Sequence, residues 1–413
     1  MKIFLITFSI FFISCNLSLA QSFNEKPPVP YLEQFDLKDM LKDIFTKKKK
    51  TIDSSALNPK KELRITILPG AAYNPATDIV IGVSANASWY YGDPSNTNNS
   101  SINTGASYTT KNQLKLSFQS NIYTSKNEWL IGGDWRYWKY VQDTYGLGTN
   151  TAQSVGQNMD FDFIRLNQNV LRRVGKYAYV GLGYDLEYYT DISTLSNEND
   201  SIIYPSFNSV YSRQQGFDSA SYLASGLMAT ATYDSRDNTI NPFKGYVFTI
   251  QYRNYNEIFG SSSNYQTLNF QAQNYHSFNK KDTYILASRF LASTLLNGRV
   301  PYMVLNAIGW DKYNTTGRGY VQGRFRGKDF LYLEIENRIT ITKNRFFGIA
   351  VFANAETMSN FDGGVKLFDY IKPAAGIGLR FLYDKYSRTN ICIDYARGVD
   401  GSSGIWFNLG EFF

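Results

Sequence analysis

The sequence predicts an all-β fold, a transmembrane antiparallel β-barrel of about 16 strands with long extracellular loops. Aromatic residues make up 16% of the 413 residues, although the mean hydropathy is below zero. After the first twenty residues there is no run of about 18 apolar residues, the length that a transmembrane helix needs. From residue 63 onward, alternating polar and apolar segments are separated by turn residues, which is the pattern of barrel strands.

The first twenty residues predict a secretory signal peptide (1–20). An apolar stretch at residues 4–14 follows a positive charge, and Ser18 and Ala20 are small residues suited to a cleavage site. We therefore expect cleavage after Ala20. The alternative is a lipoprotein modified at Cys15, which residues 12–14 disfavour.

The mature chain would keep one cysteine, Cys392, which excludes an intramolecular disulfide. Removing Lys2 with the signal leaves 42 − 1 = 41 Lys and Arg against 35 Asp and Glu, a formal charge of +6. This excess is mild and is not concentrated in one segment, so we predict no nucleic-acid partner.

Residues 21–62 are polar and contain several prolines, which predicts a periplasmic N-terminal arm. Within it a short amphipathic helix is expected, with apolar residues at helical spacing: Leu37, Met40, Leu41, Ile44 and Phe45. Two roles remain open. The helix is either a linker resting on the barrel rim or a foot on anionic lipid, helped by the lysines that follow it.

Residues 63–413 form the predicted outer-membrane barrel. In residues 113–123 and 177–188, apolar side chains alternate with polar ones and with glycines. We expect the apolar face to contact lipid and the polar face to line a hydrated lumen, with aromatic residues near the strand ends. Strands are expected to begin near Arg64, Ile79, Ser101, Gln113, Glu128, Asp160, Tyr177, Ser219, Tyr246, Tyr265, Thr283, Phe330, Phe346, Lys372, Thr389 and Ile405.

An even strand number suits closure of the barrel, which removes every sheet edge. The connections alternate in length, and short turns face the periplasm while long loops face outward. The short connections are residues 172–176, 279–282, 342–344 and 384–388, and the long ones are 141–156, 190–217 and 298–329. The connection at 92–100 is an exception, because it is longer than expected on the periplasmic side.

Three segments make the barrel region resemble the BamA/TamA-type outer-membrane assembly family, the bacterial surface antigen barrels. The first contains Arg236, Asp237, Asn238, Pro242 and Gly245. It resembles the R-D-N-x-x-x-P-x-x-G turn between strands eight and nine of the family. Proline and glycine suit a tight turn, and this resemblance makes it a periplasmic turn motif.

The second segment is Gly317-Arg318-Gly319-Tyr320 in the long loop before strand twelve. It is similar to the R-G-F/Y tip of the family, and the resemblance implies that this loop folds back into the lumen. An arginine inside a narrow barrel needs carboxylate and hydrogen-bond partners, and flanking glycines let the backbone approach the wall.

Strand twelve offers such partners. If Leu333 and Ile335 face lipid, Glu334, Glu336 and Arg338 face the lumen. The resemblance makes Glu336 the best candidate for the contact with Arg318.

Strand thirteen departs from the family pattern of an aspartate followed two residues later by a glycine. Here Asn354 and Glu356 occupy those positions. Asparagine brings no charge, so the way in which the family resemblance implies that the loop is held does not fully apply here. Glu356 is a candidate to supply the missing negative charge.

The third segment is the pair of C-terminal strands, which ends at Phe413. An aromatic residue at the end of an alternating strand has the form of the signal by which assembly machinery receives barrels. This feature is general to outer-membrane barrels. We expect the last strand to span the membrane up to Phe413.

The arm is too short for even one POTRA domain, so the resemblance implies a barrel-only member. The leading functional hypothesis is an accessory factor for insertion or transport at the outer membrane. A passive pore or structural barrel is the alternative. Expected partners are outer-membrane lipid and lipopolysaccharide and, under the leading hypothesis, assembly machinery or periplasmic client proteins.

No enzymatic activity, cofactor or metal is predicted. The single histidine, His276, lies near a short predicted turn and is expected to be an interfacial residue, and no HExxH or GxSxG segment is present. Asp191, Glu198 and Asp200 are candidates for Ca²⁺, but their irregular spacing favours simple solvation.

Overall fold

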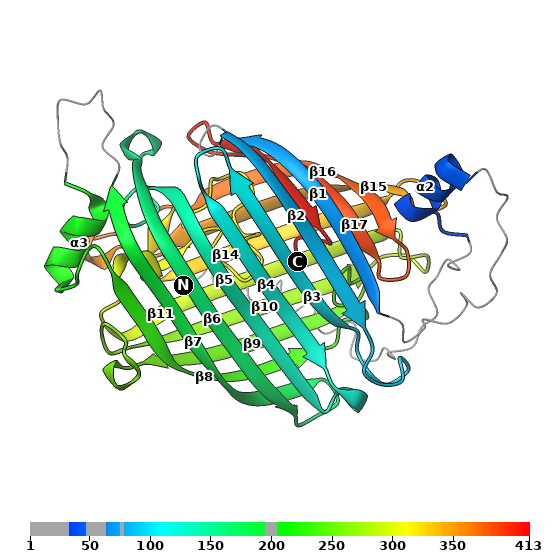
Figure 1. Ribbon diagram of the computed structural model, residues 1–413, viewed down its shortest axis with the longest axis horizontal. Coiled ribbons are helices and arrows are strands. Elements are labelled where there is room, and N and C mark those ends of the chain that lie inside the picture. Colours follow the sequence, from blue (N-terminus) through cyan, green and yellow to red (C-terminus); the bar gives the residue numbers. More distant parts are fainter. Residues whose placement is uncertain (1–32, 47–62, 75–77, 195–204) are drawn as a thin grey trace.

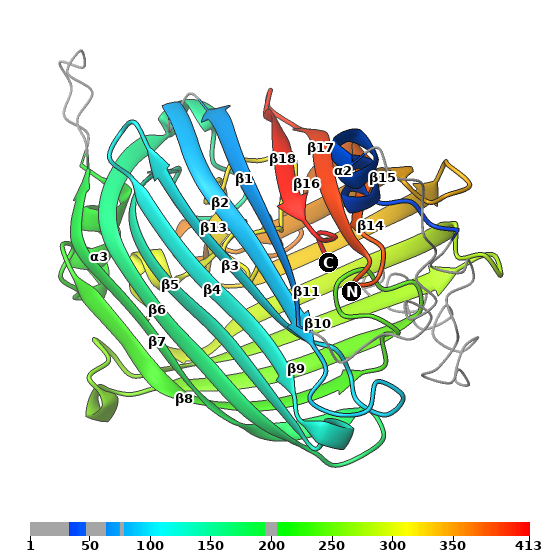
Figure 2. The same ribbon diagram turned by 45° about the vertical axis from the view of Figure 1, so that its right-hand side comes forward.

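The computed structural model describes residues 33–46, 63–74, 78–194 and 205–413. The predicted signal peptide and most of the arm lie outside these residues. Sixteen strands form one antiparallel sheet that is rolled into a nearly closed barrel (Figures 1 and 2), so the predicted fold class is confirmed. Helices of the described residues are all too short or too polar to cross a membrane.

Each strand pairs with the next in the sheet order. The strands are β1 (Arg64–Asn74), β2 (Asp78–Trp89), β3 (Ser100–Thr109), β4 (Leu114–Tyr123), β5 (Trp129–Thr144), β6 (Gln157–Arg173), β7 (Ala178–Thr194), β8 (Tyr222–Asp234), β9 (Gly245–Tyr255), β10 (Tyr265–Ser277), β11 (Tyr284–Gly298), β14 (Phe330–Thr340), β15 (Phe347–Met358), β16 (Lys372–Asp384), β17 (Thr389–Gly398) and β18 (Ser403–Leu409). A separate two-residue pair is formed by β12 (Asn306–Ala307) and β13 (Arg326–Gly327).

In the described residues, two α-helices lie beyond opposite ends of the barrel (Figure 1): α2 (Leu37–Thr46) and α3 (Phe207–Gln215). Short 3-10 helices occur in the connections: η2 (Ser125–Asn127), η3 (Gln153–Val155), η4 (Glu257–Phe259), η5 (Tyr302–Val304) and η6 (Phe361–Gly363). The end with the short turns, where α2 lies, is the periplasmic end by the general rule for such barrels.

The predicted strand starts agree with the structure. The largest differences are three residues, at β6 (Gln157 against the predicted Asp160) and at β8 (Tyr222 against Ser219). The long connection at residues 90–99 is retained, and the first three strands form despite it.

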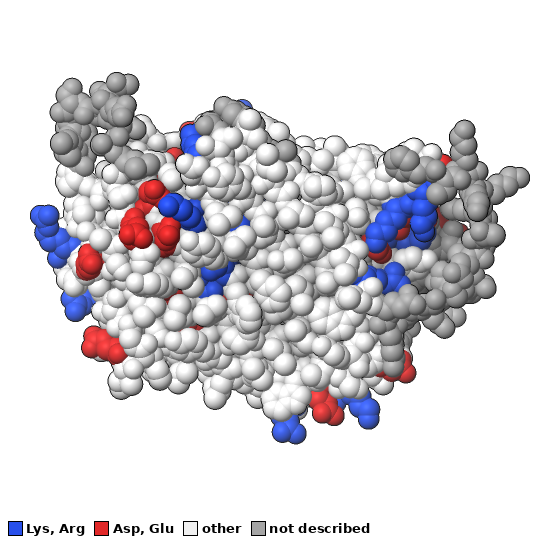
Figure 3. All heavy atoms as spheres, viewed as in Figure 1, with Lys and Arg blue, Asp and Glu red and all other residues white. Residues whose placement is uncertain are grey.

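The alternating pattern places apolar side chains outside and charges inside, as predicted. Leu182 on β7 is 71% exposed and Ile335 on β14 is 44% exposed, whereas Glu334 and Glu336 are fully buried. On the face in Figure 3, charged side chains lie mainly toward the two ends, and the surface between them is largely uncharged. Such a band suits contact with the hydrocarbon core of the membrane.

Complete closure, however, is not observed. The two ends of the sheet order are β1 and β18, and no strand ladder joins them within the described residues. We call this boundary the seam.

The expectation that the last strand spans the membrane up to Phe413 is also wrong. Strand β18 ends at Leu409, and Gly410 has a φ of +94°, a conformation that glycine adopts without a steric penalty. The chain then turns inward, so that Phe412 and Phe413 are buried. Inside the barrel Arg338 donates a hydrogen bond to the carbonyl oxygen of Phe413 (2.8 Å), which stabilises the inward course.

Candidate functional site in the barrel lumen

The connection between β11 and β14, which we call the lumen loop (residues 299–329), folds back into the barrel as predicted. Gly317 and Gly319 have φ angles of +77° and +112°. A Cβ atom on Gly319 would lie 2.5 Å from the Cβ of Ala374 on β16. Glycine is therefore required here both by the backbone conformation and by the close approach to the wall.

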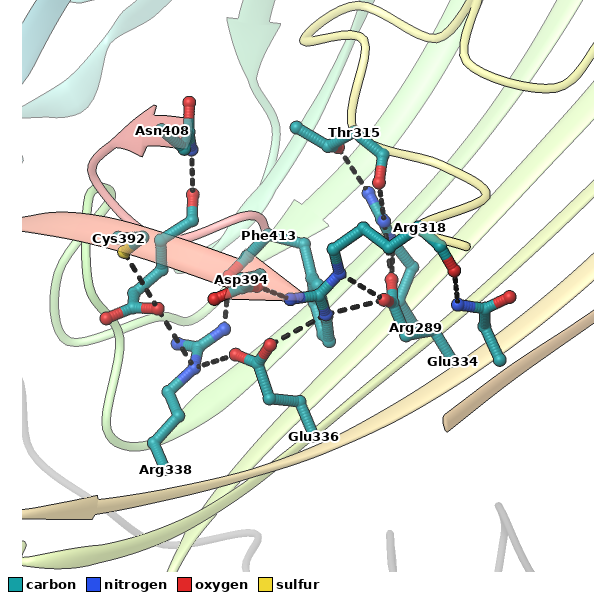
Figure 4. A network of polar contacts seen from close by, with 12 residues as sticks. Arg289, Thr315, Arg318, Glu334, Glu336, Arg338, Cys392, Asp394, Asn408 and Phe413 are labelled. Carbon is teal, nitrogen blue, oxygen red and sulfur yellow. Dashed lines mark hydrogen bonds and ion pairs between the residues drawn. The ribbon is translucent and has the colours of Figure 1, made fainter. Parts of the chain in front are cut away.

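Arg318 at the loop tip is fully buried among three carboxylates (Figure 4). Its Nη2 atom lies 2.6 Å from Glu334 Oε1 and 2.7 Å from Glu336 Oε2. Its Nη1 atom pairs with Asp394 on β17. The expected contact with Glu336 is present, but it is one of three.

The ion pairs continue from Arg318 along the lumen. Four arginines and four carboxylates interleave in one network: Arg289, Arg318, Arg338 and Arg380 with Glu334, Glu336, Asp394 and Glu411. The formal side-chain charges of this set cancel. Removing one partner from such a buried set costs about 3–5 kcal/mol, because it leaves an uncompensated charge.

Asn354 and Glu356 on β15 do not bind the guanidinium of Arg318. Asn354 Nδ2 donates instead to the backbone oxygen of Arg318 at 2.9 Å. Glu356 is 1% exposed, and neither of its carboxylate oxygens has a hydrogen-bond partner among the described residues. Glu356 lies two residues beyond Asn354 on β15, a distance of about 6.8 Å along the strand. It therefore lies beyond the part of the lumen where the ion pairs of Arg318 are found.

Tyr320, also in the predicted tip motif, fixes the loop to the wall near the seam. Its hydroxyl donates to the carbonyl oxygen of Pro373 on β16 (2.7 Å) and accepts from the N–H of Val399 (3.1 Å). The ring packs against Gly398, where any Cβ would lie within 2.5 Å of it. The tip is thus held by β16 and by the end of β17.

The lumen loop also reaches the opposite wall. Arg136 on β5 pairs with Asp134 and donates to the backbone oxygens of Asp311 and Lys312, both at 2.8 Å. Trp310 packs against Trp138 with 5.3 Å between the ring centroids.

These rings belong to a buried apolar cluster that includes Phe161, Phe163, Tyr189 and Tyr302. The expectation of a hydrated lumen is therefore wrong in this part. Aromatic side chains of β5, β6 and β7 pack directly against the lumen loop, because burying large rings is more favourable than hydrating them.

Asp311 organises the turn that carries Trp310 and Arg318. Its carboxylate accepts from the N–H groups of Thr315 (3.0 Å) and Thr316 (2.8 Å). Burial raises the pKa of Asp311, but the nearby Arg289 guanidinium and these hydrogen bonds outweigh it and hold the pKa below its usual 3.8. Asp311 is thus ionised at neutral pH.

The periplasmic turn (residues 235–244) contains the other predicted motif. Arg236 pairs with Asp234 (2.7 Å), and the side chain of Asn238 accepts from the N–H groups of Ile240 and Asn241 (both 2.8 Å). Pro242 is buried. Gly245 has a φ of +111°, and a Cβ there would collide with the backbone of Ser235.

This turn reaches the far side of the periplasmic mouth. Asp237 pairs with Arg388 in the β16–β17 turn (2.5 Å), and Phe243 lies under the guanidinium groups of Arg388 (4.3 Å) and Arg345 (5.0 Å). Burial and the nearby Arg388 lower the pKa of Arg345 to about 10. The motif therefore links turns from opposite walls.

Asp394, Arg289 and Arg380 were missed as site residues by sequence reasoning. The signal was present in β17, where Cys392, Asp394 and Ala396 alternate with outward apolar residues. What the sequence does not show is that barrel curvature brings this face of β17 opposite the lumen loop.

The other residues considered in the sequence are His276 and the candidate Ca²⁺ ligands. His276 packs edge-on against Phe278, with 4.8 Å between the ring centroids. Asp191 lies in β7, whereas Glu198 and Asp200 lie outside the described residues. No group of three or more potential metal ligands occurs in the part of the chain that the structure describes.

Comparison with known proteins gives one family. The model of the Omp85 superfamily domain matches residues 95–413. No curated protein sequence matches the chain.

Solved structures are similar in fold. BamA from Haemophilus ducreyi lacking POTRA domains 1–3 matches with a TM-score of 0.51 and 14% identity, covering 84% of this chain and 69% of that one. CdiB from Acinetobacter baumannii matches with a TM-score of 0.50 and 13% identity, covering 85% and 60%. CdiB from Escherichia coli matches with a TM-score of 0.51 and 10% identity, covering 84% and 62%. The chain thus spans less than two thirds of each CdiB chain.

Proposed function

The chain belongs to the Omp85 superfamily, and from that premise we propose that it assists the insertion of polypeptide strands into the outer membrane, or their transport across it. The resemblance to BamA/TamA-type barrels is confirmed. The protein is an integral β-barrel of the outer membrane. We further propose that it arrives there through a signal peptide cleaved after Ala20, and that its action involves no enzymatic step.

The seam between β1 and β18 carries this proposal. A sheet edge presents unpaired N–H and C=O groups that can add another strand. Most membrane barrels remove this edge by closing the sheet completely. In the part of the chain that the structure describes, no ladder covers the edges of β1 and β18, and the inward turn at Gly410 takes the last four residues away from the edge of β18.

The filled lumen supports a lateral route over an axial one. The lumen loop contacts opposite walls through Arg136 and Arg318, and the periplasmic turn reaches across the mouth to Arg388. A polypeptide crossing along the barrel axis would have to break these contacts. A strand pairing with β1 would not.

Photo-crosslinking tests the proposal. A photoreactive residue at Ile67, which is exposed on β1, should trap newly exported outer-membrane proteins. The same residue at Leu182, equally lipid-facing but in the middle of the wall, should not. Equal trapping at both positions would refute the role of the seam.

Depletion separates this function from the passive-pore alternative. We expect loss of the protein to slow the assembly or secretion of at least one outer-membrane client. Steady ion conduction by the reconstituted protein, with no assembly or secretion defect on depletion, would instead establish a passive pore. Partners under the proposal are client polypeptides, together with the lipid and lipopolysaccharide around the barrel.

A further inference from the structure

Helix α2 docks on the barrel through its polar face. The side chain of Asp36 accepts from the N–H of Lys385 (3.1 Å), and the Nζ atom of Lys385 lies 2.5 Å from Asp39. Lys38 pairs with Asp384 at the end of β16. All these partners belong to β16 or to the β16–β17 turn, so one side of the helix is held at the periplasmic rim.

The apolar side of α2 points away from this contact. Leu37, Met40, Leu41 and Ile44 share one helix face by their spacing. Leu41 is 43% exposed and Ile44 is 61% exposed. A surface helix of a water-soluble protein has the reverse arrangement, with its apolar stripe against the core.

The surface beside α2 faces lipid. Phe35, just before the helix, packs against Phe346 (5.7 Å between centroids), and Phe346 packs against Phe381 (6.2 Å). Phe381 stands on the same side of β16 as Ile377 and Leu379, which are exposed on the lipid-facing wall. Aromatic residues at the end of a strand mark the boundary between membrane and water.

We propose that α2 is an interfacial helix whose apolar face, with Leu41 and Ile44 at its centre, lies in the periplasmic leaflet of the outer membrane. The face continues the lipid-facing wall through Phe35.

The proposed contact is with acyl chains and is made by the exposed apolar side chains Leu41 and Ile44. The described part of the helix and its first turn contain two lysines and three aspartates, so they carry no positive excess: Lys38 and Lys42 against Asp36, Asp39 and Asp43. Within these residues the charge balance gives no attraction to anionic headgroups, so the proposal rests on burial of the apolar face; the lysines at 47–50 lie outside the described residues.

The position of α2 connects this membrane contact to the seam. Asp384, the partner of Lys38, also lies 4.0 Å from Arg64 at the start of β1. The Arg64 guanidinium stacks on the ring of Tyr386 (4.3 Å). A helix held in the leaflet is therefore coupled to the periplasmic base of β1.

Depth-dependent quenching tests the proposal on the full-length mature protein. Single cysteines introduced in place of Leu41, Asp43 and Ile44 carry an environment-sensitive fluorophore in vesicles of phosphatidylethanolamine and phosphatidylglycerol. The natural Cys392 is fully buried, so it should not react with the fluorophore. The protein without an introduced cysteine is treated in the same way to measure this background labelling. Leu182→Cys on the wall is the positive control for insertion of the barrel.

Spin-labelled acyl chains should quench positions 41 and 44 at least about twofold more than position 43, and aqueous iodide should show the reverse order. Quenching of position 44 by iodide alone, with normal lipid quenching at 182, would overturn the proposal. A disulfide between the cysteines at position 44 of two copies would also overturn it, because a second copy would then cover this face. Protection of position 44 from both quenchers would do the same, because something other than lipid or water would cover it.

Discussion

The guanidinium of Arg318 lies 4.4 Å from the ring centroid of Phe412. The tip of the lumen loop and the C-terminal residues of the chain therefore share one contact. The loop enters the lumen from the extracellular end of the barrel, and the C-terminal residues enter it from the periplasmic end. The same guanidinium also lies 3.5 Å from the ring centroid of Phe352 on β15. Two aromatic rings and three carboxylates thus surround one side chain, so changes to the loop and to the C-terminus should be energetically coupled.

This coupling predicts non-additive mutations. Arg318→Ala should lower the free energy of unfolding by about 3–5 kcal/mol, because Glu334, Glu336 and Asp394 lose a buried partner. Combined with Phe412→Ala, the double variant should deviate from the sum of the single changes by about 0.5–3 kcal/mol. Urea unfolding of the four proteins in detergent micelles measures the cycle. Strict additivity would show that loop and C-terminus are independent.

Gly378 on β16 should not tolerate a side chain. A Cβ there would collide with Asp394 Oδ1, which already pairs with Arg380, while Oδ2 of the same carboxylate pairs with Arg318. Gly378→Ala should therefore destabilise the barrel by about 1–3 kcal/mol. Gly70→Ala is the matched control, since no atom lies within 4 Å of the new Cβ. Equal urea midpoints for both variants would contradict the packing.

Acid should release the lumen loop. The pKa of Asp311 is held below 3.8 in the folded loop. The ionised carboxylate therefore contributes fully to the stability of the loop above pH 3.8, and this contribution is lost as the pH falls through the lower pKa of the folded state. Ion leak through reconstituted protein should rise below a pH of about 4. Asp311→Asn should leak at neutral pH and respond less to acid. A variant that matches the original protein at every pH would rule out this role.

Trp310 anchors the loop on the β5–β7 wall. Trp310→Ala should cost about 3–5 kcal/mol, because it leaves a cavity between Trp138 and Phe163. The tryptophan emission of the remaining cluster should shift to longer wavelength as water enters. Trp135→Ala is the control. It removes a lipid-facing ring from β5, the strand that also carries Trp138, and should leave the loop in place.

The strands were predictable because each needs only local information. A period of two and a turn residue place the start of β14 at Phe330 and that of β16 at Lys372 without knowledge of the rest. The face of each strand follows from the same alternation, as Glu334 and Ile335 show.

The site was only partly predictable because its partners meet through barrel curvature. Arg318 and Glu336 are close in sequence, whereas Asp394 reaches Arg318 only because β17 stands beside the loop tip. The inward course of Phe413 depends on one φ angle at Gly410, which alternation in the last strand does not reveal. Trp310 lies in a loop without periodicity, so no pattern indicated its contact with β5.

No ladder crosses the seam among the described strands, so the barrel lacks the continuous ring of interstrand hydrogen bonds that fixes the circumference of a closed cylinder. The lumen loop supplies a different mechanical element, a strut that runs across the interior from Arg136 on β5 to Glu334 on β14. These strands stand seven neighbours apart in the sixteen-stranded order, close to diametrically opposite. The cross-section can thus keep its shape while the seam widens, so that opening the wall need not flatten the cylinder.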